Sequence, residues 1–261
     1  MRLATYLVDG EDHPRAGEVR GDEVVAFRSG TVLDRLASGD RAPADGEAHP
    51  LAAVRLLAPV PRPRAIFGIG LNYADHAAET GRDAPERPIV FLKLPSSSAP
   101  PNDALDVPAA TRRRLDYEGE LAVVMGAGGE VAGYAIADDV SARDLQGREP
   151  QWTRAKGFDR SCPWGPWITT ADELGDPRDR AVRTWVNDEL RQDGTTADLI
   201  FGVPDVVAFI SETCTLEPGD LILTGTPAGV GMAMDPRRFL ASGDVVRIAI
   251  DGLGEIEHAI A

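Results

Sequence analysis

The sequence predicts a strand-rich fold in which strands outnumber helices and do not alternate with them regularly. This pattern argues against a doubly wound α/β sheet, because such a sheet needs strands and helices to alternate along the chain. The predicted strands are short apolar runs bounded by Gly, Pro, Asp or Asn. In the main part of the chain they cover residues 65–70, 88–94, 120–126, 131–137, 182–186, 220–225 and 245–250.

Three parts follow one another along the chain. Residues 1–57 alternate short apolar pieces with Gly, Asp and Pro, which predicts a small β-rich N-terminal domain. Residues 58–64 contain three prolines and predict an extended linker. Residues 65–261 then make up the main domain, and a chain of 261 residues is long enough for one sizeable core with a small appendage.

Two helices are predicted in the main domain. The first covers 72–80, with Asn72 as its N-cap and Gly81 just past its end. The second covers 203–212, with Pro204 in its first turn and apolar residues at helical spacing. An Asp-Gly pair at 251–252 separates two apolar runs and predicts a final β-hairpin.

The composition narrows the class of protein. A net charge of −15 argues against a nucleic-acid partner, which needs a basic patch, and against an anionic membrane surface. No secretory signal is evident, and no apolar run approaches the roughly 20 residues that cross a bilayer. Two cysteines, Cys162 and Cys214, are too few for a disulfide framework. We therefore expect a soluble cytoplasmic protein with reduced thiols.

Several familiar motifs are absent or incomplete. GIGLNY at 68–73 lacks the third glycine of a dinucleotide-binding fingerprint, and GTPAGVG at 225–231 has no lysine after a glycine, as a P-loop requires. The sequence contains neither HExxH nor GxSxG. These absences remove most nucleotide-binding, zinc-protease and serine-hydrolase interpretations.

An acidic pair lies on one predicted strand. Glu118 and Glu120 are two residues apart, so both carboxylates point to the same face. Asp138 and Asp139 end another strand, and one of them could complete a set of three oxygen ligands. Oxygen ligation without histidine or thiol favours a hard cation such as Mg²⁺, Mn²⁺ or Ca²⁺. The alternative is a solvated acidic face, and the apolar run after Glu120 argues against it by anchoring the strand in the core.

A histidine and a glutamate share one face of the first predicted helix. His76 and Glu79 are at positions i and i+3, so their side chains are neighbours. A carboxylate beside an imidazole fixes its tautomer and raises its basicity, which suits a general base that activates water. The alternative is an exposed histidine that happens to face a glutamate.

Lysine is rare in this chain. Among 27 basic residues only Lys93 and Lys156 are lysines, and the others are arginines. Arginine cannot transfer a proton, since its pKa stays above about 12, whereas burial can tune a lysine and its compact ammonium can reach a developing oxyanion. Each retained lysine is therefore a candidate functional group, with chance survival as the alternative.

Taken together, the residues described above resemble those of the fumarylacetoacetate hydrolase family. The matching segments run in the family's order across residues 66–231, and the series E-x-E, D-x-S-A-R-D-x-Q and K-x-F is specific to it. The first 57 residues resemble the small N-terminal domain of bacterial members. The segments are GLNYADHAAE, PIVFLKLPSS, DYEGELAVVMG, GYAIADDVSARDLQ, AKGFDRSCPWGPW, LRQDGTTADLIFGVPDVVAFIS and LEPGDLILTGTPAGVG.

The resemblance implies a fold, a metal site and a set of site residues. The implied fold belongs to the α+β class, with a mixed, rolled β-sheet, and the implied assembly is a homodimer. Arg143 would be either a substrate contact or a structural charge partner. The implied roles are Mg²⁺ or Mn²⁺ binding by Glu118, Glu120 and Asp139, water activation by His76 and Glu79 on a mobile lid, catalysis by Lys156, and substrate contact by Lys93, Gln146 and Thr226.

Two departures from the family pattern affect the substrate more than the metal site. The eukaryotic hydrolase branch carries a further metal-binding Asp before the lid histidine, and GIGLNY contains no acid there. A leucine, Leu94, also stands between Lys93 and Pro95, where the family commonly has Lys-Pro.

The implied activity is hydrolysis of a carbon–carbon bond in a β-diketo or acylpyruvate-type 2-oxo acid through a metal-stabilised enolate. Relatives that tautomerise hydroxydienedioates or decarboxylate oxaloacetate keep the same enolate without attack by water, so both activities are alternatives. A non-catalytic metal-dependent binding protein is a third, which the retained lysines and the His76–Glu79 pair disfavour.

Overall fold

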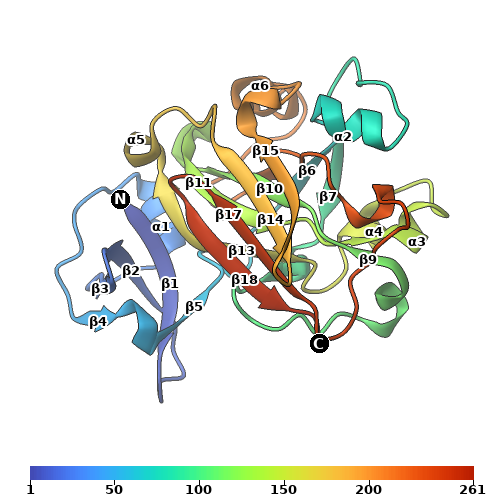
Figure 1. Ribbon diagram of the computed structural model, residues 1–261. Helices are drawn as coiled ribbons and strands as arrows, with labels where there is room; N and C mark the ends of the chain where they lie inside the picture. The colour runs from blue at the N-terminus through green and yellow to red at the C-terminus, as the bar shows by residue number, and fades with distance from the viewer.

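The computed structural model describes residues 1–261, which form an α+β fold around a mixed β-sheet of twelve strands (Figure 1). Only the β16–β6 and β13–β8 pairs are parallel. Ten strands follow in the order β4-β3-β2-β1-β13-β11-β10-β16-β6-β7, while β5 pairs with β1 and β8 with β13. Their bounds are β1 Arg2–Val8, β2 Arg15–Arg20, β3 Glu23–Ala26, β4 Ala48–Pro50, β5 Val54–Leu57, β6 Ile66–Gly70, β7 Ile89–Lys93, β8 Ser98–Ala99, β10 Gly119–Met125, β11 Val131–Asp138, β13 Cys162–Thr170 and β16 Leu221–Leu223.

Two smaller sheets complete the strands. A four-stranded antiparallel sheet has the order β15-β14-β17-β18, with β14 Ala181–Val186, β15 Glu189–Thr195, β17 Val245–Ile250 and β18 Gly254–Ala259. The pair β17–β18 is the predicted final hairpin. The third sheet pairs β9 Leu115–Asp116 with β12 Ser141–Ala142.

Strand β10 is buried on both faces, which explains its continuous apolar sequence. Leu121, Val123 and Met125 join the larger core, which also contains side chains of the four-stranded sheet and of the helix at 203–211. The intervening Ala122 and Val124 join a second core with side chains of the N-terminal strands and of β13. The strand that carries Glu120, and that begins just after Glu118, is therefore packed between the two cores.

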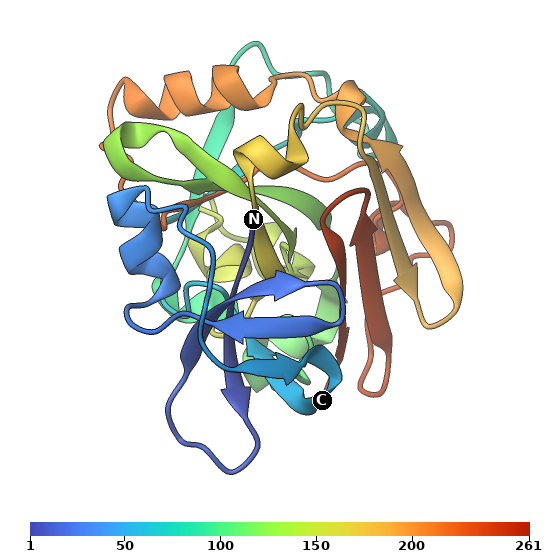
Figure 2. The ribbon, with the colours of Figure 1, turned by 90° about the vertical axis from the view of Figure 1, so that its left-hand side faces the viewer.

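The first 57 residues continue the large sheet. Strand β1 pairs antiparallel with β13, where Leu3 lies opposite Ile168 (Figures 1 and 2). Sequence analysis did not predict β13, because its segment CPWGPWITT contains two prolines and a glycine. It also missed a helix within the N-terminal part, which begins after a capping box formed by Thr31 and Asp34. The division of the chain into two domains stays a prediction.

The six α-helices are short: α1 Val32–Ser38, α2 Ala74–Glu79, α3 Arg143–Gln146, α4 Thr153–Lys156, α5 Ala171–Leu174 and α6 Val203–Ser211. Helices α2 and α6 are those predicted, but the N-cap of α2 is Tyr73 and makes no side-chain cap bond, so the assignment of Asn72 as cap was wrong. The Asn72 side chain instead donates to the carbonyls of Phe201 and Thr224, which fixes the entry to α2.

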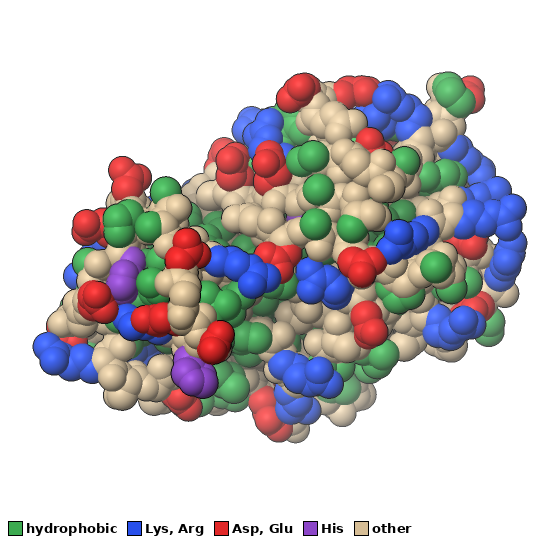
Figure 3. All heavy atoms as spheres, turned by 90° about the horizontal axis from the view of Figure 1, so that it is seen from below, with side chains coloured by type: hydrophobic (Ala, Val, Ile, Leu, Met, Phe, Trp, Pro, Cys, Tyr) green, Lys and Arg blue, Asp and Glu red, His purple; other side chains and the backbone are tan.

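None of these helices has the length and apolarity to cross a bilayer. On the face seen from below, acidic and basic side chains are interspersed (Figure 3). Both cysteines are free, Cys162 in the core and Cys214 at the surface.

Candidate metal centre and active site

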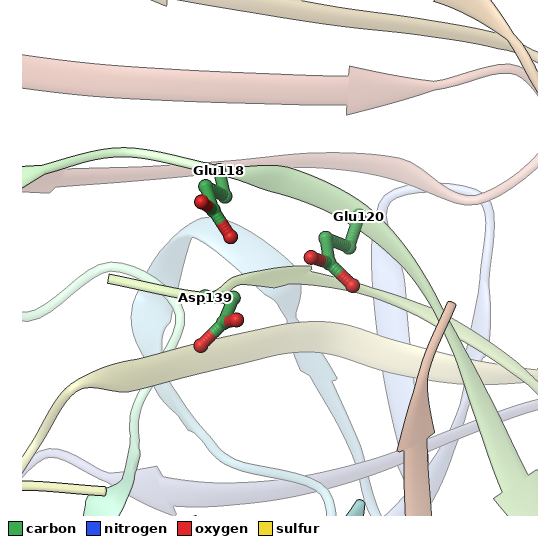
Figure 4. A group of neighbouring side chains, drawn as sticks. All are labelled: Glu118, Glu120 and Asp139. Carbon is green, nitrogen blue, oxygen red and sulfur yellow. The ribbon is translucent and has the colours of Figure 1, made fainter. Parts of the chain in front are cut away.

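Three carboxylates converge where strands β10 and β11 meet (Figure 4). One oxygen from each of Glu118, Glu120 and Asp139 lies within 4.8 Å of the others, and all three residues are buried. The strand register causes this convergence. Glu120 faces Ala137, and the amide of Asp139 donates to the carbonyl of Glu118 at 2.9 Å, so the three side chains emerge on one face.

Both lysines of the chain contact this cluster. The Lys156 ammonium bridges Glu118 and Asp139, with a distance of 2.7 Å to the aspartate. The Lys93 ammonium lies 2.6 Å from the other oxygen of Asp139 and also donates to the backbone carbonyl of Lys156. Although burial lowers the pKa of Lys156, the charges of Asp139 and Glu118 raise it above its ordinary value. Lys156 is therefore a cation in the site and not a neutral base.

Arg143, at the start of α3, supplies a third buried cation. Its Nη2 lies 2.6 Å from Glu118, and its Nε donates to Asp116 at 2.8 Å. Asp116 in turn accepts from the amides of Gly231 and Met232. Burial alone would raise the pKa of Glu118, but the charges of Lys156 and Arg143 outweigh it and lower the pKa below its ordinary range. Arg143 thus acts chiefly as a structural charge partner.

Glu120 is the one carboxylate of the three without a cation. Its Oε2 accepts only the amide of Gly225, at 2.7 Å. Burial and the charges of Asp139 and Glu118 raise its pKa well above the ordinary value. Four buried carboxyl groups, counting Asp116, share only three buried cations, which are Lys93, Arg143 and Lys156. The deficit and the all-oxygen donor set both fit a hard divalent cation held by Glu118, Glu120 and Asp139.

Asp138 is not part of the triad and supports it from behind. Its Oδ1 accepts the amide of Glu118 at 2.8 Å, and its Oδ2 lies 3.1 Å from Nε2 of the buried His258 on β18. The C-terminal hairpin thereby helps to fix the backbone at Glu118.

The predicted histidine–glutamate pair is formed. On α2, Nδ1 of His76 lies 2.7 Å from Oε1 of Glu79. The second oxygen of Glu79 accepts the amide of Gly229 at 2.8 Å, which ties the helix to the loop after β16. The imidazole is therefore oriented through Nδ1, which leaves Nε2 for chemistry.

One cavity brings these groups together. The cavity has a volume of about 770 Å³, and this figure includes the solvent-filled space at its mouth. Of the site residues that the sequence predicts, it is lined by His76, Glu118, Glu120, Gln146, Lys156 and Thr226, with Arg143 beside them. Glu79, Lys93 and Asp139 lie behind this lining and contact it through His76 and Lys156.

The three residues assigned to substrate differ in their surroundings. Lys93 has a fully buried side chain and contacts Asp139, which favours a role as a charge partner over substrate contact. Gln146 accepts from Arg143 through its Oε1. The hydroxyl of Thr226 donates to the carbonyl of Gly119 and accepts from Gln192, so its proton is already used.

Sequence reasoning missed part of the lining. Phe91 precedes Lys93 by two on β7, so period-two spacing could have placed it on the same face. Trp152 packs edge-on against Phe91, with ring centroids 5.5 Å apart, and comes from a loop with no pattern to identify it. Leu71, Arg82 and Met232 are also in the lining and likewise lie outside any motif.

The fumarylacetoacetate (FAA) hydrolase C-terminal family model matches residues 65–261, the part of the chain that carries every group described above. The chain belongs to the fumarylacetoacetate hydrolase family. It is 42% identical over 225 residues to the oxaloacetate tautomerase YisK of Bacillus subtilis, covering 81% of this chain and 75% of the relative.

Solved structures of the family share the whole fold. A fumarylacetoacetate hydrolase from Exiguobacterium antarcticum has a TM-score of 0.88 and 37% identity over 100% of this chain and 99% of its own. A maleylpyruvate hydrolase from Sphingobium sp. SYK-6, solved with manganese(II) and pyruvate, has a TM-score of 0.80 and 33% identity over the same shares. The chain is therefore an enzyme of the fumarylacetoacetate hydrolase family whose acidic triad could bind a metal ion.

Replacing Glu120 separates metal binding from folding. We expect Glu120→Gln to weaken Mn²⁺ binding by more than the roughly 10- to 100-fold that loss of an outer-shell partner costs. The metal-free variant should be at least as stable as the wild type, because a buried carboxyl group without a cation is replaced by a neutral side chain of the same size. Thermal unfolding with and without Mn²⁺ measures both effects.

Glu118→Gln is the matched control. It should lose Mn²⁺ binding too, but it should also lower the free energy of unfolding by about 1–3 kcal/mol, because Lys156 and Arg143 lose a partner. A Glu120→Gln protein that Mn²⁺ stabilises as much as the wild type would contradict the assigned site.

Proposed function

We propose that this enzyme is a divalent-metal-dependent hydrolase that cleaves a carbon–carbon bond in a β-diketo or acylpyruvate-type 2-oxo acid. The observation that carries the proposal is the common cavity. The oriented imidazole of His76, the carboxylates of Glu118 and Glu120 and the ammonium of Lys156 all line it. A general base and an electrophilic site would therefore face the same substrate molecule in this cavity.

The acidic end of the cavity would receive the 2-oxo carboxylate of the substrate. A Mg²⁺ or Mn²⁺ ion held by Glu118, Glu120 and Asp139 would supply the positive charge that binds this group and polarises its ketone. Lys156 and Lys93 hold two of the three carboxylates in place. Phe91, whose ring centroid lies 5.3 Å from the Lys156 ammonium, and Trp152, which packs against Phe91, form an apolar wall at this end.

His76 would activate the attacking water. Its Nδ1 is held by Glu79, so Nε2 takes one proton while the hydroxide adds to the distal carbonyl carbon. The bond between that carbon and the pyruvate methylene then breaks, and its electron pair passes into a pyruvate enolate. The positive charge of Lys156 stabilises the enolate oxygen, and the proton on His76 completes the products, pyruvate and a carboxylic acid.

A panel of oxo acids tests this proposal. With Mg²⁺ or Mn²⁺ present, we expect pyruvate release from an acylpyruvate, loss of activity on chelation and recovery on metal addition. Lys156→Arg should lower turnover about 100-fold, because the bulkier guanidinium cannot take the position of the ammonium between Glu118 and Asp139. Arg154→Lys on the exposed face of α4 is the control and should keep its activity. Near wild-type turnover by a folded Lys156→Arg protein would exclude the assigned role.

Tautomerisation and decarboxylation are the alternative reactions on the same site. The 42% identity to an oxaloacetate tautomerase is the specific observation in favour of tautomerisation. Both reactions proceed through an enolate, but neither needs attack by water.

His76→Ala separates the reactions. Hydrolysis should fall by about 10²- to 10⁴-fold, because the base that activates water is lost. Decarboxylation of oxaloacetate should fall much less, since no water is activated. His13→Ala, at an exposed position outside the cavity, is the control. Product analysis by NMR measures both reactions, and unchanged hydrolysis by the His76→Ala protein would remove the imidazole from the mechanism.

We also propose that the enzyme is a homodimer, as the family resemblance implies. Strand β7 is an edge of the large sheet. Val90 and Leu92 on this strand and Leu94 just after it are exposed, and such a surface suits burial against a second copy.

Sedimentation measures this assembly directly. The wild type should sediment at twice the chain mass of 27.8 kDa, and Leu92→Glu should shift the equilibrium toward the monomer. Leu190→Glu, at an equally exposed leucine on β15, is the control. A monomeric wild type would disprove the dimer, and a Leu92→Glu protein that stays dimeric would move the interface elsewhere.

A further inference from the structure

Gln192 on β15 is a fully buried side chain that makes three hydrogen bonds to the active-site segments. Its Oε1 accepts the amide of Gly119 at 3.0 Å. Its Nε2 donates to the hydroxyl of Thr226 at 2.7 Å and to the carbonyl of Pro227 at 2.8 Å. A backbone amide at one end and a backbone carbonyl at the other permit only one orientation of the side-chain amide. Gln192 therefore joins the four-stranded sheet to two separate segments of the site.

Gly119, the first of these contacts, lies in the chain between the two glutamates of the triad (Figure 4). Its amide donates to Gln192, and its carbonyl accepts the hydroxyl of Thr226 at 2.9 Å. Because Thr226 itself accepts from Gln192, both backbone groups of Gly119 depend on this one side chain. A Cβ at position 119 would collide with Thr184 on β14, so glycine allows the backbone to approach the four-stranded sheet closely.

The loop after β16, residues 224–230, is the second segment that the glutamine holds. Two of its backbone amides bind carboxylates of the site: Gly225 donates to Glu120, and Gly229 donates to Glu79. The carbonyl that the glutamine binds lies between these two amides in the chain. A shift of the loop would therefore displace a hydrogen-bond donor to the triad and a hydrogen-bond donor to the partner of the imidazole together.

We propose that Gln192 is a positioning residue of the metal centre, which holds the backbone between Glu118 and Glu120 and aligns the loop that binds Glu120 and Glu79. The inference rests on the proposed function, because that function assigns a metal ion to the triad. Removal of the side-chain amide leaves buried backbone groups without partners, and they must move to find others. Since a divalent ion needs its oxygen ligands in a defined geometry, such movement lowers metal affinity although every ligand is still present.

Titration of the metal-free protein with Mn²⁺ tests this role without turnover. Gln192→Leu removes all three hydrogen bonds and should weaken Mn²⁺ binding by about 10- to 100-fold, the loss that removal of an outer-shell partner causes. The matched control is Val182→Ala, a fully buried truncation on the neighbouring strand β14 that removes no hydrogen bond. It should lower the thermal stability and keep the wild-type affinity. Electron paramagnetic resonance of free Mn²⁺ measures the affinity.

Hydrogen exchange of the Gly119 amide gives a second measurement, which needs no metal. In the metal-free wild type this amide should exchange slowly, and in Gln192→Leu it should exchange faster. Gln192→Glu should restore slow exchange, because its carboxylate has the same reach and still accepts from Gly119. NMR of the metal-free proteins measures these rates. If Gln192→Leu does not fold, Gln192→Asn takes its place, since its amide is one methylene too short to keep all three bonds, and both losses are expected for it.

Three outcomes would contradict the proposal. A folded Gln192→Leu protein that binds Mn²⁺ as tightly as the wild type, or that protects the Gly119 amide equally, would overturn the role of Gln192 and leave the proposed function intact. An equal loss of Mn²⁺ affinity in Val182→Ala would show that lower stability alone weakens the site, and it would overturn the role as well. A wild type that binds no Mn²⁺ would overturn the proposed metal site itself.

Discussion

The ion-paired network around Glu118 and Asp139 is the constraint on which the site depends. Burying carboxylates this close together costs several kcal/mol per ion unless positive charge is supplied. Lys156, Lys93 and Arg143 supply it from β7, α3 and α4, so three separate segments are held against the end of the β10–β11 pair. The same contacts leave Glu120 without a cation, an imbalance that a divalent cation bound by the triad could offset.

Packing of the twelve-stranded and four-stranded sheets holds the ion-paired network in place. Strand β10 packs into both cores, and Asp138 joins the backbone at Glu118 to His258 of the last strand. Helix α2, which also lines the cavity, is short and largely exposed. Its Glu79 accepts a hydrogen bond from the amide of Gly229 in the loop after β16. The acidic centre thus faces His76 on a helix of six residues in which only His76 and Ala77 are buried, and elements with few buried residues open locally at a low free-energy cost.

Much of the site could be predicted from the spacing of residues within one strand or one helix. The parts that depend on contacts between distant segments could not be predicted in this way. The alternation of Glu118 and Glu120 and the i, i+3 spacing of His76 and Glu79 are properties of a single strand and a single helix. Strand β13 escaped prediction because its prolines and glycine break every strand pattern, although sheet pairing with β1 and β11 holds it in place. The partnership of Arg143 with Asp116 joins residues 27 positions apart, and no period connects them.

Because lysine is rare in this chain, Lys93 and Lys156 pointed to the site, but their rarity did not show that the two lysines differ in role. Lys156 reaches two carboxylates through a single nitrogen and still lines the cavity. Lys93 lies behind Asp139 and donates to the carbonyl of Lys156, so it helps to position Lys156 and has no surface in the cavity. Arginine serves where a wide fork is needed, as Arg143 does between Asp116 and Glu118. The two lysines of this arginine-rich chain thus converge on Asp139, where each ammonium donates to one of the two carboxylate oxygens.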